Sequence, residues 1–170
     1  MADITGTENK DTLIGTASDD FIRGLSGNDV STGGDGNDRL EGGDGRDTLD
    51  GENGVDIVYG GGGTDIISDK NQGNGQLFGE EGNDSLNIGR ENTTNISSAV
   101  LADGGAGDDI FNLFDFSFSF NGSSLSATLL GGTGDDTFNA SDVGNETTLT
   151  IDAGEGSDGN YILELAHGCY

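Results

Sequence analysis

The chain has 170 residues, with 32 Asp and Glu against 6 Lys and Arg, and a formal net charge of -26. This charge disfavours nucleic acid and anionic membrane surfaces as partners and favours divalent cations. Leu, Ile, Val and Phe make up little more than a fifth of the residues, close to the composition at which highly charged chains stay disordered, so apolar burial alone does not suffice to fold the chain.

Residues 6–68 form a tandem repeat of seven nonapeptides with no residue left over. The clearest copies are Gly-Gly-Asp-Gly-Asn-Asp-Arg-Leu-Glu at 33–41 and Gly-Gly-Asp-Gly-Arg-Asp-Thr-Leu-Asp at 42–50, so the pattern is G-G-x-G-x-D-x-U-x with U apolar. The Asp at the sixth position recurs every nine residues, at Asp11, Asp20, Asp29, Asp38, Asp47, Asp56 and Asp65. The first two copies keep the first Gly and this Asp but lose the middle glycines.

The apolar position of the repeat predicts a very short strand after each tight turn, and therefore a thin core. This position holds Leu13, Ile22, Leu40, Leu49, Val58 and Ile67, with Ser31 as the exception. Two nonapeptides make one coil of 18 residues. Successive repeats are therefore expected to alternate between two sides of an all-β solenoid.

A motif-free stretch, 69–78, follows the repeat block and carries Gly75 where the Asp is expected. The motif then returns with Asp84, Asp109, Asp136 and, in degenerate form, Asp158. If each intervening piece replaces one nonapeptide, every returning Asp lies on the side of Asp11. A long row then holds Asp11, Asp29, Asp47, Asp65, Asp84, Asp109, Asp136 and Asp158, and a short row holds Asp20, Asp38 and Asp56.

We therefore expect residues 1–68 to form a two-sided roll, and residues 69–170 to continue it with motifs on one side, wider coils and a C-terminal cap. The later coils are 25, 27 and 22 residues long. Most of the motif-free pieces end in a strand-like run, at 76–78, 98–101, 127–130 and 147–151. The alternative is that the repeat block ends near Ser68 and an unrelated β domain follows.

An aromatic segment, Phe114–Phe120, alternates strictly and is followed by Asn121-Gly122 and a second alternating run at 125–129. This pattern predicts a hairpin or a pair of strands with one apolar face. The face either closes the wide part of the coil as a local core or forms an exposed patch for a partner or for self-association. The run at 161–165 predicts a last strand or cap, since solenoids need covered ends.

The residue types of the turn suit Ca²⁺, which takes 6 to 8 carboxylate and carbonyl oxygens at about 2.3–2.6 Å. Glycines at positions 1, 2 and 4 are expected to allow φ > 0 and to direct carbonyls to a common point, which the short Asp side chain also reaches. The expected main-chain ligands are the oxygens of Gly34, Gly36, Gly43, Gly45, Gly61, Gly63, Gly105, Gly107, Gly132 and Gly134. One turn supplies too few oxygens, so each site is expected between two stacked turns, with up to about nine ions in all.

Stacked carboxylates also make the cation necessary. Neighbouring coils are expected about 4.8 Å apart, the spacing of strands in a sheet. Two carboxylates at that distance repel by about 3.5 kcal/mol at an effective dielectric constant of about 20, and a divalent ion between them reverses the sign of this energy. We therefore expect a chain that is expanded without calcium and compact with it.

In these repeats the chain resembles the RTX, or hemolysin-type, calcium-binding family, closely over 6–68, again at 79–87, 104–112 and 131–139, and partially at 153–161. The resemblance implies a parallel β-roll with calcium between the turns. It also implies bacterial secretion by a type I machinery that reads an uncleaved C-terminal signal, and an extracellular or cell-surface location. The N-terminus shows no pattern of a secretory signal peptide, which agrees, and no apolar run is long enough to span a membrane.

A structural, cell-surface or secretion-related calcium module is the leading functional hypothesis, and enzyme activity is not expected. The only His, His167, lies with the only Cys, Cys169, at the C-terminus, a place that does not favour nucleophilic catalysis. Adhesion or ligand binding through Phe114–Phe120 is an alternative. Ice binding, found among relatives with regular Thr and Asn rows, is a minor one, because the third turn positions of the long row are mixed: Glu8, Ser26, Asp44, Gly62, Glu81, Ala106 and Thr133.

Overall fold

The computed structural model describes residues 1–69, 75–89, 98–114, 125–143 and 147–165. Throughout these ranges the regular elements are strands, without a helix. They are β1 (Asp3–Thr5), β2 (Thr12–Ile14), β3 (Phe21–Gly27), β4 (Val30–Asp35), β5 (Arg39–Gly45), β6 (Thr48–Asn53), β7 (Ile57–Gly63), β8 (Ile66–Asp69), β9 (Gln76–Gly82), β10 (Ser85–Gly89), β11 (Ser98–Ala106), β12 (Ile110–Phe114), β13 (Leu125–Thr133), β14 (Thr137–Val143), β15 (Thr147–Asp152) and β16 (Gly159–Leu165).

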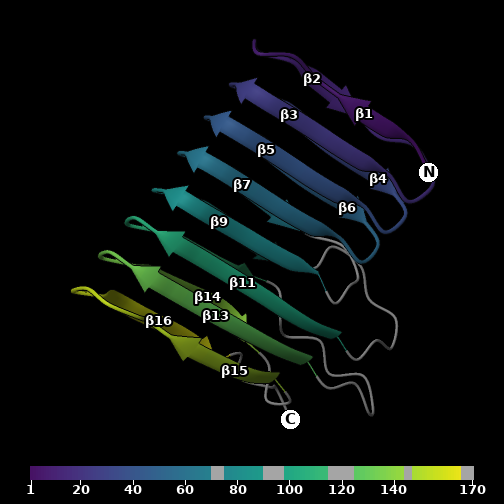
Figure 1. Cartoon of the computed structure of the whole chain (residues 1–170). Helices are drawn as coiled ribbons and strands as arrows, with labels where there is room; N and C mark the ends of the chain where they lie inside the picture. The colour runs from purple at the N-terminus through teal and green to yellow at the C-terminus, as the bar shows by residue number, and fades with distance from the viewer. Residues whose placement is uncertain (70–74, 90–97, 115–124, 144–146, 166–170) are drawn as a thin grey trace.

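The strands form two parallel sheets, one of all odd-numbered strands and one of all even-numbered strands (Figure 1). Each strand pairs with the strand two places later, so Phe21 of β3 pairs with Arg39 of β5, and Val30 of β4 with Thr48 of β6. The chain therefore winds as a coil that crosses from one sheet to the other at every turn. This is a parallel β-roll, and the predicted fold class is confirmed.

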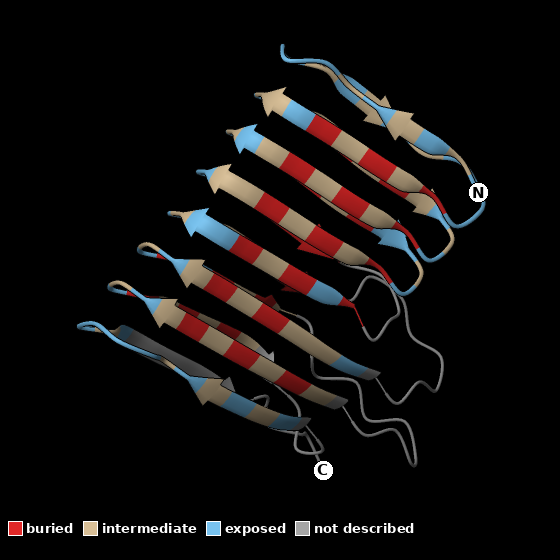
Figure 2. Ribbon diagram, in the orientation of Figure 1, coloured by how far each residue is buried: buried red, intermediate tan, exposed pale blue. Residues whose placement is uncertain are grey.

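The core lies between the two sheets and is built from the alternating inward positions of the strands (Figure 2). Leu40 of β5 and Leu49 of β6 are fully buried, whereas Arg39 and Thr48, one position earlier, are not. Ser31 keeps the inward position between Leu13 and Leu49 in the even sheet, and it is buried. Val30 beside it does not take its place, because a shift by one residue would turn the whole strand over.

The C-terminal half buries a second apolar layer. In the even sheet Ile88, Leu113 and Ala140 are paired in register and buried. Phe111 and Phe138, two residues earlier on their strands, stack with ring centroids 4.7 Å apart. β11 and β13 have 9 residues each, against 7 in β3 and β5. These longer strands lie in the half of the chain that buries Phe111 and Phe138.

Several segments that the sequence predicts as strands are strands in this fold. The four strand-like runs before the returning motifs lie in β9, β11, β13 and β15. Residues 161–165 lie in β16, which pairs with β14 at the end of the even sheet. The sequence pattern missed β1, which begins the odd sheet.

Of the aromatic segment Phe114–Phe120, the structure describes only Phe114. Its residues 115–120 lie outside the described ranges, and Phe114 ends β12 in the even sheet, whereas Leu125 begins β13 in the odd sheet. The two described strands therefore do not form a hairpin with one another. No helix long and apolar enough to cross a membrane occurs in the ranges that the structure describes.

Candidate calcium sites

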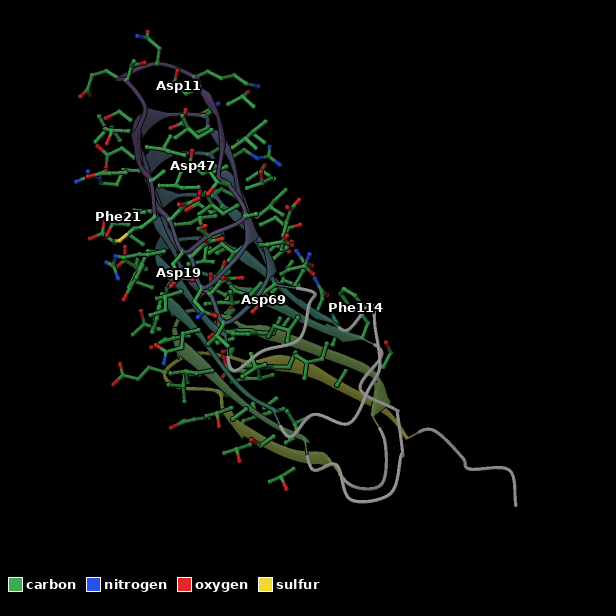
Figure 3. All side chains as sticks on the ribbon, turned by 90° about the vertical axis from the view of Figure 1, so that its right-hand side faces the viewer. Asp11, Asp19, Phe21, Asp47, Asp69 and Phe114 are labelled. Atoms are coloured by element: carbon green, nitrogen blue, oxygen red, sulfur yellow. The ribbon has the colours of Figure 1, made fainter. Side chains whose placement is uncertain are left out.

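Each motif Asp lies in a turn, as the residue immediately before a strand, and these residues stack from coil to coil (Figure 3). Turns that lead from the odd into the even sheet carry the long row, and those that lead from the even into the odd sheet carry the short row. Figure 3 labels two members of the long row, Asp11 and Asp47, and Asp29 lies between them in the hydrogen-bonded series. Asp84, Asp109, Asp136 and Asp158 belong to the same row as Asp11, since each precedes an even-numbered strand.

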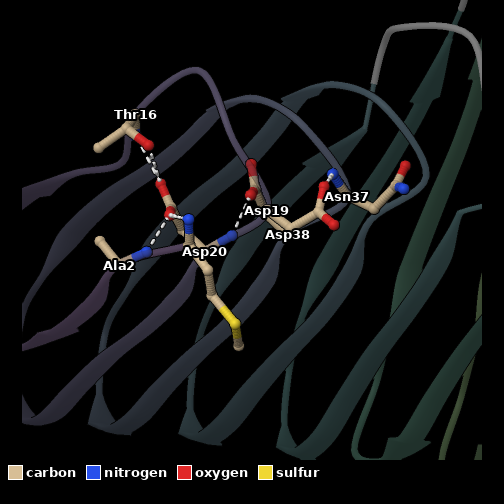
Figure 4. A network of polar contacts seen from close by, with 7 residues as sticks. Ala2, Thr16, Asp19, Asp20, Asn37 and Asp38 are labelled. Carbon is tan, nitrogen blue, oxygen red and sulfur yellow. Dashed lines mark hydrogen bonds and ion pairs between the residues drawn. The ribbon is translucent and has the colours of Figure 1, made fainter.

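One hydrogen bond repeats along both rows: the main-chain N–H of each Asp donates to the Oδ1 atom of the Asp in the next coil. It measures 2.7 Å from Asp29 to Asp47. In the wide half it measures 2.8 Å from Asp84 to Asp109 and from Asp109 to Asp136. In the short row the bond joins Asp20 to Asp38 at 2.7 Å and Asp38 to Asp56 at 2.8 Å, and Figure 4 shows the start of this row. Oδ1 thus orders the stack.

The second carboxylate oxygen, Oδ2, is buried without a hydrogen-bond partner in the described part of the chain. This holds for Asp29, Asp38, Asp47, Asp56, Asp65, Asp84, Asp109 and Asp136. The side chains themselves are at most 2% exposed. An anionic oxygen buried without a partner is costly, and a cation beside it removes that cost. These orphaned oxygens are what a row of metal sites requires.

The first glycine of each motif lies against this oxygen. A Cβ atom on Gly42 would meet Asp47 Oδ2 and the carbonyl oxygen of Gly60, the first glycine of the next coil, and Gly24 has the same surroundings from Asp29 and Gly42. One carboxylate and one carbonyl oxygen therefore converge on a space that a side chain would fill. The expectation that position 1 needs φ > 0 is wrong: Gly42 and Gly24 are outside the left-handed region, and the reason for glycine there is lack of room.

Positions 2 and 4 do adopt the left-handed region. Gly43 has φ 104° and Gly45 φ 136°. The same conformation holds for all ten glycines whose carbonyls were expected to bind calcium: Gly34, Gly36, Gly43, Gly45, Gly61, Gly63, Gly105, Gly107, Gly132 and Gly134. A Cβ on Gly63 would meet the Gly45 carbonyl oxygen of the coil before, so these carbonyls face the next turn. The Gly132 carbonyl also accepts the N–H of Glu155 at 2.8 Å, which leaves it one lone pair.

Burial raises the pKa values of the inner Asp side chains, because a low-dielectric interior disfavours the charged form. The pKa reaches about 7 for Asp56, Asp65 and Asp109, with a further rise from neighbouring like charges. Burial likewise raises the pKa of the same carboxyl group in four other turns, at Asp38, Asp47, Asp84 and Asp136. A cation at the orphaned oxygens would act in the opposite direction and hold these groups ionised.

The N-terminal ends of the rows differ from their middles. Asp11 Oδ2 accepts the Thr7 N–H at 2.6 Å and the Thr7 hydroxyl at 2.8 Å, and Asp20 Oδ2 accepts the same two groups from Thr16 at 2.6 and 2.7 Å. The N–H of Ala2 donates to Asp20 Oδ1 and lowers the pKa of Asp20. The Oδ2 atoms of both carboxylates are thus already satisfied, and they need a cation less than those of the inner turns.

Among the residues that the structure describes, one buried carboxylate falls outside the motif. Asp69, the last residue of β8, is 5% exposed, and its charge contributes to the raised pKa of Asp56. The motif Asp follows the first motif Gly by five residues, whereas Thr64 stands five residues before Asp69, so the sequence pattern does not single out Asp69. No group of three or more His, Cys, Asp or Glu side chains in the described ranges is close enough to hold a metal without main-chain oxygens, as expected for sites of one or two carboxylates plus carbonyls.

Stacked turns with buried, orphaned carboxylate oxygens define a calcium-binding β-roll. The model of the RTX calcium-binding nonapeptide repeat matches the chain in four copies, at residues 5–40, 32–67, 71–92 and 121–142. These ranges cover more than half of the chain, so the chain belongs to this family. No curated protein matches the chain.

Proposed function

We propose that this protein is a secreted calcium-binding β-roll whose folding is driven by Ca²⁺. One observation carries the proposal: eight buried Asp side chains each keep an oxygen without a hydrogen-bond partner in the described ranges. In a chain of net charge -26, such a stack is destabilised by its own repulsion. Calcium supplies the charge that stabilises it, so binding and folding become one equilibrium.

The proposed ligands are the row Asp side chains together with main-chain oxygens. They are Asp11, Asp20, Asp29, Asp38, Asp47, Asp56, Asp65, Asp84, Asp109, Asp136 and Asp158, with the carbonyls of the ten glycines named above. The inner members are the stronger sites, since Asp11 and Asp20 already bind Thr7 and Thr16. Residues 1–68 provide sites on both sides and 69–170 on the long row, up to about nine ions.

The biological role that we propose is structural: a cell-surface component, or a module that assists secretion and folds where calcium is plentiful. Membership of the family supports the proposal that a type I machinery exports the protein to a bacterial extracellular location. We propose no catalytic role. His167 and Cys169 lie outside the described residues.

Circular dichroism and size-exclusion chromatography of the full chain test this function. In EDTA we expect an expanded chain with little β signal, and with millimolar CaCl₂ a compact β-rich one. MgCl₂ at the same concentration is the control: Mg²⁺ demands a tight octahedral shell and keeps its waters, so it should support folding poorly. A chain equally compact and β-rich in EDTA overturns the proposal.

No contact in the described ranges favours the adhesion alternative or the ice-binding alternative. Residues 115–120 of the aromatic segment are outside those ranges, so binding through Phe114–Phe120 stays a hypothesis. Binding of a glycan or surface that Phe116→Ser and Phe118→Ser abolish, with folding intact, would establish adhesion. Thermal hysteresis would establish ice binding.

A further inference from the structure

The short row has a break after Asp56, where the motif-free segment begins, and the register shows what replaces it. Asp50 of β6 pairs with Ser68 of β8, so Asp69 follows at the place that Gly51, the first glycine of its motif, holds one coil earlier. Asp69 in turn pairs with Ile88, an inward and buried position. The place of the first motif glycine is therefore taken by a carboxylate, Asp69, directed between the sheets.

Gly75 is the residue directly before β9, the place that the motif Asp holds before the other strands. Ile57 pairs with Gln76, so Gly75 stands one coil after Asp56. The main chain continues the row there: the Asp56 carbonyl accepts the N–H of Gln76 at 2.9 Å, and the Gly75 carbonyl accepts that of Leu101 at 3.2 Å. Only the carboxylate side chain of the motif Asp is absent, because Gly75 stands in its place.

The two positions have exchanged their residues. In an ordinary turn, a Cβ on the first glycine would meet the Oδ2 atom of the sixth-position Asp, as for Gly33 and Asp38. Here a Cβ on Gly75 would meet Asp69 Oδ2 instead, with the Asp56 carbonyl oxygen 3.6 Å away. The Asp69 carboxylate thus lies against the position where the motif Asp would stand, and Gly75 leaves the room for it.

Asp56 supplies the second half of this arrangement. It is fully buried, and its Oδ2 atom has no hydrogen-bond partner in the described ranges. Two carboxylates of successive coils therefore lie inside the roll at the end of the short row. They resemble in placement the pairs Asp20–Asp38 and Asp38–Asp56, but one of them comes from outside the repeat motif.

We propose that Asp69 replaces the missing motif Asp and that, with Asp56, it holds a further divalent cation of the Ca²⁺ type. The short row then has three intervals between carboxylates rather than two. This inference rests on the proposed function, since it needs the rows to bind calcium at all. It adds a site that the nonapeptide pattern does not contain.

The number of bound ions tests the site, measured by native mass spectrometry of the full chain at saturating CaCl₂. Asp69→Asn keeps the size of the side chain and removes its charge, and we expect it to bind one ion fewer than the wild type. Asp44→Asn, an exposed turn Asp with the same charge change, is the control and should keep the wild-type number. An Asp69→Asn chain that folds and keeps the wild-type number overturns the inference.

A double variant moves the carboxylate back to the motif position. Asp69→Gly with Gly75→Asp restores Gly at the first place and Asp at the last, and Gly75 is outside the left-handed region, so its backbone accepts a side chain. We expect this variant to recover the lost ion, which also decides the case if Asp69→Asn does not fold. A double variant that folds without the ion, or does not fold, overturns the exchange. A wild type that binds no calcium overturns the proposed function itself.

Discussion

The main-chain N–H of Asp65 donates to Asp84 Oδ1 at 2.8 Å, the same bond that joins Asp47 to Asp65. Asp65 and Asp84 are 19 residues apart in the sequence, whereas Asp47 and Asp65 are 18 residues apart. The long row therefore passes the end of the nonapeptide block without a change in its hydrogen bonding.

Asp84→Asn tests whether the long row binds calcium beyond the nonapeptide block. The Asn oxygen can still accept the Asp65 N–H, so the fold keeps its bond, but the charge between two coils is lost. We expect the calcium concentration at the folding midpoint to rise about tenfold or more, equivalent to about 1.4 kcal/mol, and one or two ions to be lost. Asp44→Asn is the matched control. An unchanged calcium titration would show that the later motifs bind no calcium.

The metal-free chain should lose stability as the pH rises. The folded-state pKa values of Asp56, Asp65 and Asp109 are about 7, above the value of about 3.9 in an unfolded chain. The folded state then binds more protons, so these groups stabilise it fully below about pH 4 and lose that effect between about pH 4 and 7. Circular dichroism in EDTA across this range measures it, with light scattering as a control for aggregation.

Calcium binding should depend on pH in the opposite sense. Protons compete with calcium for the same carboxylates, so the calcium concentration at the folding midpoint should rise as the pH falls from about 7 to 5. A midpoint that stays constant over this interval would mean that the buried carboxylates do not bind the ion.

Two glycine substitutions separate lack of room from loss of flexibility. Gly42→Ala places a methyl group against Asp47 Oδ2 and the Gly60 carbonyl, so we expect calcium-dependent folding to fail or to cost several kcal/mol, about 3 or more. Gly62→Ala meets only Asp44 Oδ1 at 3.6 Å and should be neutral or stabilise by up to about 1 kcal/mol. Urea unfolding in saturating calcium compares them. Equal effects would contradict the steric account of position 1.

Much of the fold could be predicted from the sequence, because the register is a local property that repeats. A period of nine residues with one apolar position predicts alternate strands in two sheets, and the hydrogen bonds of Asp29 and Asp47 have the expected separation of 18 residues. The later coils keep their register because Leu77 and Leu86 still take the inward positions. The reason for glycine at position 1 could not be predicted, since the collision of a Gly42 Cβ atom with Asp47 Oδ2 is visible only in three dimensions.

Other features carry no sequence pattern. β1 is only three residues long, and it forms because β3 offers it an edge, not because its own residues demand a strand. Asp69 shares neither spacing nor neighbours with the motif, so its place beside Asp56 follows from the pairing of Asp50 with Ser68. Calcium binding stays a prediction for each of the eleven motif Asp side chains.

Ser31→Val should stabilise the roll. Ser31 lies in the core between Leu13 and Leu49, and its hydroxyl has no hydrogen-bond partner in the described ranges. Val removes this buried polar group and adds apolar contact where other coils hold Leu or Ile, for a gain of about 1–2 kcal/mol. Urea unfolding at saturating calcium measures the change. A loss of stability would mean that the coil is too narrow here for a larger side chain.

Leu25→Gly should also stabilise. Leu25 has φ 84° at the second motif position, where most turns carry Gly, and it is 40% exposed, so little burial is lost. Relief of left-handed strain outweighs the entropy cost of Gly, for a net gain of about 0.5–1 kcal/mol. Leu25→Ala is the control: it keeps the strain and should not stabilise in the same thermal melt.

The hydrogen bonds of the Asp rows all run in one direction, from the N–H of one coil to the carboxylate of the next coil toward the C-terminus. A stack that loses its last coil leaves an amide N–H without an acceptor, which is a neutral group. A stack that loses its first coil leaves a carboxylate without a donor, and an unsatisfied charge costs more than an unsatisfied amide. The two ends of the roll therefore present different groups: carboxylates at the N-terminal end, which Thr7 and Thr16 cap in this chain, and amides at the C-terminal end.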